Sequence, residues 1–278
     1  MSLTTALAAC APSSVQRADT TTVSIAPLAY AVRAVIGDSA DINVLTPAGA
    51  SPETYQPTPA QLTALSESRL YVKIGTLGFE RTQLEKLTAN MPHLICVNAS
   101  KGITPIEDDH GHHSDGGDPH TWTSPANMKV IAANICHAFI ELDTTRTRAF
   151  IDRLHRFSTH LDSIDAAIRQ RLNGAPTRTF LIYHPALAYF AKAYGLRQLS
   201  VEHDGKDASA ERMAQLIETC RREKVRTVFI QKEYSGQTAR AIAREIGAEV
   251  VEINPLSADW ESEILNIADA LGSPKTAN

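Results

Sequence analysis

The stretch TTRTRAFIDRLHRFSTHLDSIDAAIRQRLN, residues 144–173, decides the fold of this 278-residue chain. Its apolar side chains recur every three or four residues, which places them on one face of a helix. They are Phe150, Leu154, Phe157, Leu161, Ile164, Ile168 and Leu172. Neither Pro nor Gly interrupts the pattern until NGAP at 173–176 ends it. We therefore predict one continuous helix, about 45 Å long at ~1.5 Å per residue, rather than two helices with a kink.

Short apolar, β-branched runs lie on both sides of this helix. Four precede it, at 22–28, 42–47, 70–75 and 94–99, and four follow it, at 179–184, 197–202, 225–231 and 248–253. Helical patterns lie between several of them, at 58–68, 80–90, 186–194, 209–223 and 236–246. Strands that alternate with helices form parallel sheets. The predicted fold class is α/β, with two lobes that each contain a four-stranded parallel sheet flanked by helices. One long helix joins the lobes, and a cleft lies between them.

This pattern divides the chain into four parts: a tail at 1–20, a first lobe at 21–143, the linking helix at 144–174 and a second lobe at 175–278. The tail contains LAAC at 7–10, which resembles the lipobox of a bacterial lipoprotein. The basic residues that open such a leader are absent, so we expect a truncated signal with a lipid anchor on Cys10. The alternative is a disordered tail in which this cysteine is incidental. No other segment approaches the ~20 apolar residues of a membrane span.

Composition and cysteine spacing exclude several kinds of site. The net charge of −4 provides no basic patch for nucleic acid, so we expect no nucleic-acid partner. Cys96, Cys136 and Cys220 are far apart and form no Cys-x-x-Cys pair, which argues against a thiolate metal cluster. We interpret all three as small buried apolar residues. Whether two of them form a disulfide stays open.

Four polar side chains follow strands of the two predicted sheets. Glu53 follows the second strand and His120 the fourth, whereas His184 ends the fifth and Asn254 follows the eighth. Parallel sheets bind ligands beyond the carboxyl ends of their strands, so we expect these residues to meet between the lobes. Two imidazoles and a carboxylate suit Zn²⁺ or a neighbouring divalent ion. The sequence thus predicts a metal site in the interlobe cleft.

With these residues identified, the chain resembles the zinc- and manganese-type solute-binding proteins of bacterial ABC transporters. The resemblance rests on GASPETYQPTPAQ (49–61), DPHTWTSPANM (118–128), YHPALAYFAKAYGL (183–196) and VFIQKEYSGQTARAIAREIGAEVVEINPL (228–256). It implies that His120 and His184 are metal ligands. Glu53 stands where most relatives have histidine, and Asn254 where an aspartate is common. Glu53 brings a carboxylate oxygen in place of a nitrogen ligand, and Asn254 offers only a neutral carbonyl oxygen. Because both departures suit oxygen chemistry, the resemblance leaves both Zn²⁺ and Mn²⁺ open as the bound ion.

The resemblance also implies a function. We expect a periplasmic or extracytoplasmic binding component that captures Zn²⁺, or Mn²⁺, and delivers it to a membrane permease with its ATPase. We expect a monomer, anchored by lipid, and no enzyme activity. A hydrolytic zinc enzyme is the main alternative, but His-Glu-x-x-His, Gly-x-Ser-x-Gly and P-loop motifs are absent. A surface adhesin is a third class.

The segment EDDHGHHSDG at 107–116 is rich in histidine and acidic residues. Its glycines and polar side chains predict a loop without a packed core. Many zinc-binding relatives carry such a loop just before the DPH motif. The resemblance therefore implies an accessory role in capturing metal or sensing its excess. The alternative is a flexible loop whose histidines have no role.

Overall fold

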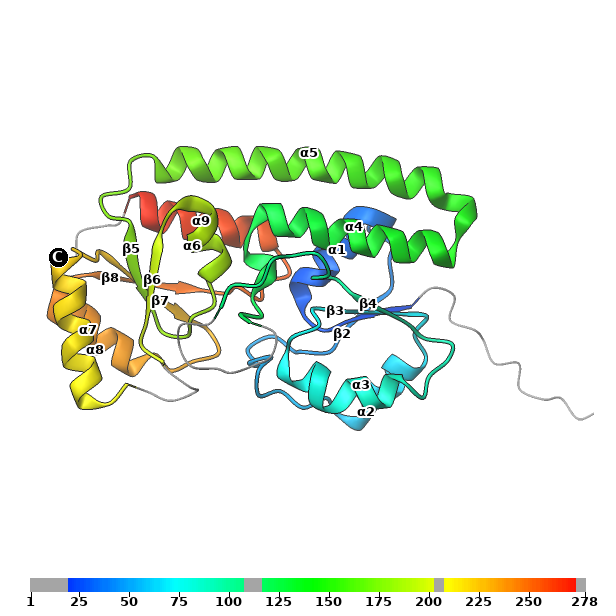
Figure 1. Ribbon diagram of the computed structural model, residues 1–278, viewed down its shortest axis with the longest axis horizontal. Coiled ribbons are helices and arrows are strands. Elements are labelled where there is room, and N and C mark those ends of the chain that lie inside the picture. The colour runs from blue at the N-terminus through cyan, green and yellow to red at the C-terminus, as the bar shows by residue number, and fades with distance from the viewer. Residues whose placement is uncertain (1–19, 108–116, 203–207, 274–278) are drawn as a thin grey trace, which may run out of the picture.

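The structure is a computed structural model that describes residues 20–107, 117–202 and 208–273. Two parallel four-stranded sheets lie side by side beneath a long helix (Figure 1). The first sheet has the order β2-β1-β3-β4 and the second β6-β5-β7-β8. The first contains β1 (Thr21–Val23), β2 (Ile42–Val44), β3 (Leu70–Lys73) and β4 (Ile95–Asn98). The second contains β5 (Thr179–Ile182), β6 (Arg197–Ser200), β7 (Thr227–Gln231) and β8 (Glu249–Ile253). The predicted fold class is confirmed.

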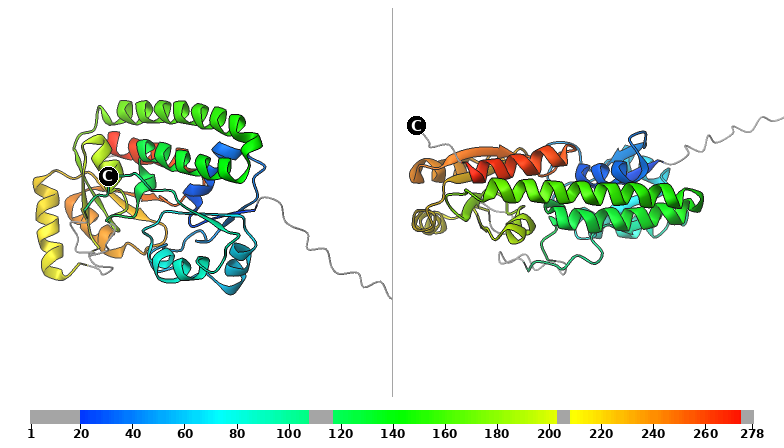
Figure 2. Two further views of the ribbon diagram at one scale, coloured as in Figure 1. Left: turned by 45° about the vertical axis from the view of Figure 1, so that its right-hand side comes forward. Right: turned by 90° about the horizontal axis from the view of Figure 1, so that it is seen from above.

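The joining helix is α5 (Thr147–Leu172), which is unbroken over 26 residues and follows a short 3-10 turn, Thr144–Arg146. Six of the seven apolar side chains of its predicted stripe are buried, and Leu154 is half-buried. Seen from above in Figure 2, α5 crosses both lobes between α4 (Pro125–Leu142) on one side and α1 (Ala26–Ile36) and α9 (Trp260–Gly272) on the other. The prediction of one continuous helix is confirmed.

The other helices cover the remaining faces of the sheets. They are α2 (Pro59–Ser66), α3 (Glu85–Thr88), α6 (Ala188–Tyr194), α7 (Ala210–Arg222) and α8 (Gln237–Ile246). A π-helical turn, Glu80–Leu84, leads directly into α3. In Figure 1, α2 and α3 lie on the face of the first sheet opposite to α1 and α4. None of the described helices is both long and apolar enough to cross a bilayer.

The strand predicted at 22–28 is wrong in its second half. β1 ends at Val23, and α1 begins at Ala26 with Pro27 in its first turn. Proline favours this position because its fixed φ suits a helix start and its missing N–H needs no partner there. The apolar run therefore spans a strand end and a helix start, which its composition alone does not separate.

The two lobes share one apolar core beneath α5. A single cluster of buried side chains includes Val32 of α1, Ile164 of α5 and Ile267 of α9, together with residues of both sheets. Burying each such side chain contributes roughly 1.5–3 kcal/mol. A wide opening of the lobes would expose this cluster to water, so the fold favours small loop movements over hinge closure.

Candidate metal centre

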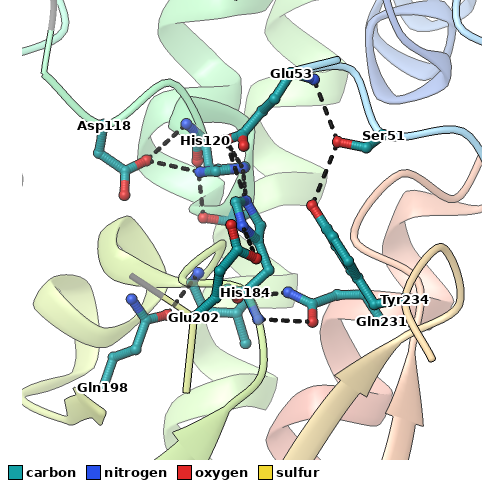
Figure 3. Close-up of polar contacts among 11 residues, drawn as sticks. Ser51, Glu53, Asp118, His120, His184, Gln198, Glu202, Gln231 and Tyr234 are labelled. Atoms are coloured by element: carbon teal, nitrogen blue, oxygen red, sulfur yellow. Dashed lines mark hydrogen bonds and ion pairs between the residues drawn. The ribbon is translucent and has the colours of Figure 1, made fainter. Parts of the chain in front are cut away.

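Three of the predicted ligands come together at the carboxyl ends of the strands (Figure 3). Glu53 lies in the loop after β2, His120 lies just before the turn that opens α4, and His184 lies two residues beyond β5. Glu53 Oε1 is 3.2 Å from His184 Nε2 and 3.8 Å from His120 Nε2. The two Nε2 atoms are 3.3 Å apart. The first lobe thus supplies two of these candidate ligands and the second lobe one.

These separations suit a tetrahedral ion. Zinc bonds of about 2.0–2.2 Å at tetrahedral angles place ligand atoms about 3.3 Å from one another. The three observed distances bracket this value. Both histidines are only 4% exposed, whereas the Glu53 side chain is 30% exposed. The arrangement can therefore hold an ion by three protein atoms, with Glu53 on the solvent side.

Each of the two histidines has a carboxylate beside the Nδ1 atom of its ring. Asp118 Oδ1 lies 3.0 Å from His120 Nδ1, and Glu202 Oε2 lies 3.0 Å from His184 Nδ1. When the ring is neutral, donation of its Nδ1–H to a carboxylate leaves the lone pair on Nε2, where a metal can bind. Sequence reasoning missed both carboxylates. Glu202 ends the predicted run 197–202, so the rule for strand ends could have identified it.

The backbone of His184 is held by the last residue of β7. Gln231 Nε2 donates to the carbonyl oxygen of His184 at 2.6 Å, and His184 N–H donates to Gln231 Oε1 at 3.3 Å. The ring of Tyr234 stacks on the imidazole with centroids 5.3 Å apart. The Tyr234 and Ser51 hydroxyls are 3.3 Å apart, and the Glu53 backbone N–H donates to Ser51 Oγ at 3.4 Å. These contacts connect His184 to the Glu53 loop across the lobe boundary (Figure 3).

His184 is protonated at neutral pH when no metal is bound. Burial by itself lowers the pKa of His184, but the hydrogen bonds to Glu202 and Glu53 and their charges outweigh burial. Together they raise its pKa from 6.5 to about 10. A metal ion that binds Nε2 must therefore displace a proton.

A cavity of about 580 Å³ is lined by all three candidate ligands. The loop after β3 and the π-helical turn form part of its wall, which includes Gly78, Arg81 and Thr82. The buried Glu80 carboxylate fixes this loop, because it accepts the backbone N–H groups of Ile74 at 2.9 Å and Gly75 at 2.6 Å. The cavity provides a path by which an ion can reach the site.

Trp122 links the first-lobe histidine to the second lobe. Its ring centroid is 5.2 Å from that of His120, and the side chain is 1% exposed. Trp122 Nε1–H donates to the carbonyl oxygen of Pro255 at 2.9 Å. In return, Trp260 Nε1–H donates to the carbonyl oxygen of Trp122 at 2.8 Å. These reciprocal bonds fix the wall of the site on the side of β8.

The structure does not place Asn254 with the other three predicted ligands, and the ligand roles of all four residues stay predictions. The Asn254 backbone N–H donates to Glu263 Oε1 at 2.9 Å, and its carbonyl oxygen accepts the Ser257 N–H at 2.8 Å. Asn254 does not line the cavity of about 580 Å³. It also does not line a second, smaller pocket that both histidines contact. Cys10 and residues 108–116 of the histidine-rich segment lie outside the described residues.

The cysteine interpretation is right for two of three positions. Cys136 and Cys220 are buried, as expected for small apolar residues, but Cys96 is exposed on β4. All three are free thiols in the described part of the chain. None belongs to the group of metal-ligand atoms.

Comparison with known proteins gives concordant results. The family model of ZnuA, the periplasmic component A of the zinc-uptake complex, matches residues 22–269. The high-affinity zinc uptake system protein ZnuA of Bacillus subtilis (strain 168) is 26% identical over 242 residues, which cover 83% of this chain and 76% of that protein. The iron-binding protein YfeA of Yersinia pestis is 26% identical over 81% of this chain and 74% of its own. A crystal structure of ZnuA superposes with a TM-score of 0.85 at 37% identity, covering 91% of this chain and 97% of that one.

Proposed function

The chain belongs to the ZnuA family of periplasmic zinc-uptake components, and from that premise we propose that it captures Zn²⁺ through Glu53, His120 and His184. Its family consists of solute-binding transport proteins and not of enzymes. The observation that carries the proposal is the meeting of three ligand atoms from two lobes at separations suited to a tetrahedral ion.

The ligand set favours Zn²⁺ over Mn²⁺. Two of the three protein ligands are imidazole nitrogens, which suit zinc, whereas manganese prefers oxygen ligands. The names of relatives leave the metal open, because one is a zinc uptake protein and another an iron-binding protein. A fourth ligand would complete the tetrahedron, and we propose that water or the side-chain oxygen of Asn254 supplies it.

The loaded protein would then dock on a membrane permease, whose ATPase drives transport. The continuous core beneath α5 supports release through local movement of the ligand loops rather than separation of the lobes. We further propose that Cys10 carries a lipid that holds the protein, as a monomer, at the outer face of the membrane.

Elemental analysis of protein purified without chelator tests the metal assignment, followed by competition between Zn²⁺ and Mn²⁺ in titration calorimetry. We expect one zinc ion per chain and a tighter Kd for Zn²⁺. Glu53→Gln should weaken zinc binding, whereas the exposed Glu67→Gln, on the same lobe, should not. Binding of Mn²⁺ in preference to Zn²⁺, or no stoichiometric metal, would contradict the proposal.

A further inference from the structure

We propose that Asp118 and Glu202 are positioning residues that set the metal affinity of this site, each by holding one ligand histidine. The inference rests on the proposed function, in which His120 and His184 bind the ion. Neither carboxylate belongs to the group of ligand atoms formed by Glu53 and the two histidines. Each acts on the metal only through the ring it contacts.

The pairing of Glu202 with His184 follows from the second sheet. In the parallel register of β5 and β6, Ile182 lies opposite Ser200. Just beyond these strand ends, Val201 N–H donates to the carbonyl oxygen of Ile182 at 3.0 Å and Glu202 N–H donates to that of Tyr183 at 2.9 Å, which keeps Glu202 beside His184. Glu202 is 5% exposed. A carboxylate so buried is costly without a partner, and the imidazole Nδ1 at 3.0 Å provides one.

Asp118 is held more firmly, and by both lobes. Its Oδ1 accepts two hydrogen bonds from His120, one from the backbone N–H at 2.7 Å and one from Nδ1 at 3.0 Å. The Asp118 carbonyl oxygen accepts the hydroxyl of Tyr189, on α6 of the second lobe, at 3.2 Å. The Asp118 backbone N–H donates to the carbonyl oxygen of Ile106, in the first lobe, at 3.0 Å. Figure 3 shows Asp118 and Glu53 on opposite sides of the His120 ring.

The two carboxylates therefore preform the site. An imidazole without a partner at Nδ1 can turn, or carry its hydrogen on Nε2, and metal binding must then fix the ring. Loss of a carboxylate partner of this kind typically weakens metal binding about 10–100-fold. Because each carboxylate serves a different ring, we expect both to contribute.

Two substitutions of Glu202 separate orientation from charge. Glu202→Gln keeps an oxygen that can accept the Nδ1–H but removes the charge, and we expect the Kd for Zn²⁺ to rise about tenfold. Glu202→Leu removes both the acceptor oxygen and the charge, and we expect the Kd for Zn²⁺ to rise about a hundredfold. Glu252→Gln and Glu252→Leu, at an exposed glutamate of β8, are the matched controls and should leave the Kd unchanged. Asp118→Asn tests the other ring in the same way.

The measurements are the Kd from competition with a chromophoric chelator and the visible spectrum of the Co²⁺-loaded protein. The visible bands of bound Co²⁺ depend on ligand geometry, so a rotated imidazole alters them. If Glu202 had a purely structural role, its replacement would lower only the melting temperature. A folded Glu202→Leu protein with the wild-type Kd and cobalt spectrum overturns the inference. If that variant does not fold, the same result for Glu202→Gln overturns it. Failure of the wild-type protein to bind zinc would instead overturn the proposed function.

Discussion

Replacing His184 with alanine should remove most of the zinc affinity. The substitution deletes one of the three proposed ligand atoms, the Nε2 that lies 3.2 Å from Glu53 Oε1. Structural zinc sites bind with about 10–16 kcal/mol over four ligands, or about 3 kcal/mol for each. At 1.4 kcal/mol per tenfold change, we expect a rise in Kd of roughly a hundredfold or more.

The same substitution should leave the protein folded. Gln231 binds only backbone atoms of His184, which alanine retains. The main cost is the buried Glu202, which loses its imidazole partner. An unpaired buried polar group costs about 1–3 kcal/mol, more when it is charged. At about 2–4 °C per kcal/mol, the metal-free protein should melt several degrees lower but still cooperatively.

Chelator competition at fixed pH measures the Kd, and circular dichroism of the metal-free protein measures the melting temperature. His137→Ala is the matched control, because this histidine is exposed on α4, away from the site. It should change neither quantity. A wild-type Kd in a folded His184→Ala protein would refute the assignment of this residue as a ligand.

Four further measurements test the proposed site. Zinc affinity should rise about tenfold per pH unit from pH 6.5 to about 8.5, because the pKa of His184 near 10 means that zinc displaces a proton; calorimetry in buffers of different ionisation enthalpy counts that proton, and a flat profile would contradict the idea. In the metal-free protein, the raised pKa makes the His184 contribution to stability complete below pH 6.5 and lost as pH rises through about 10, which urea unfolding across this range can measure. Gly78→Val should weaken zinc binding by roughly tenfold, because a Cβ at this position would lie 3.0 Å from the Glu53 carbonyl oxygen and displace the ligand loop, whereas Gly174→Val, with no neighbour within 4 Å, should not. Free zinc at a thousandfold excess over Kd should stabilise the fold by about 4 kcal/mol, a shift that calorimetric melting detects and a chelator reverses; equal melting with and without zinc would argue against binding to the folded state.

Local sequence patterns determined most of the architecture. The apolar spacing from Phe150 to Leu172 specifies α5 because helical neighbours three and four residues apart share a face regardless of the rest of the chain. The short β-branched runs located all eight strands for a similar reason. The rule that ligands lie beyond strand ends brought Glu53, His120 and His184 together as candidates. The boundary inside 22–28, and with it α1, was not identified, since a short apolar run suits a strand or a buried helix equally. Helices α4 and α9 were not predicted either.

Only the tertiary structure decided which atoms meet. The two Nε2 atoms lie 3.3 Å apart although 64 residues separate His120 from His184, and the packing of both lobes against α5 sets that distance. The pairing of His184 with Glu202 depends on the register of β5 with β6, which no local pattern encodes. The bonds between Trp122 and the second lobe likewise join segments more than 130 residues apart. Sequence periodicity reflects contacts within one turn or strand, whereas a metal site depends on sub-ångström placement of side chains from distant elements.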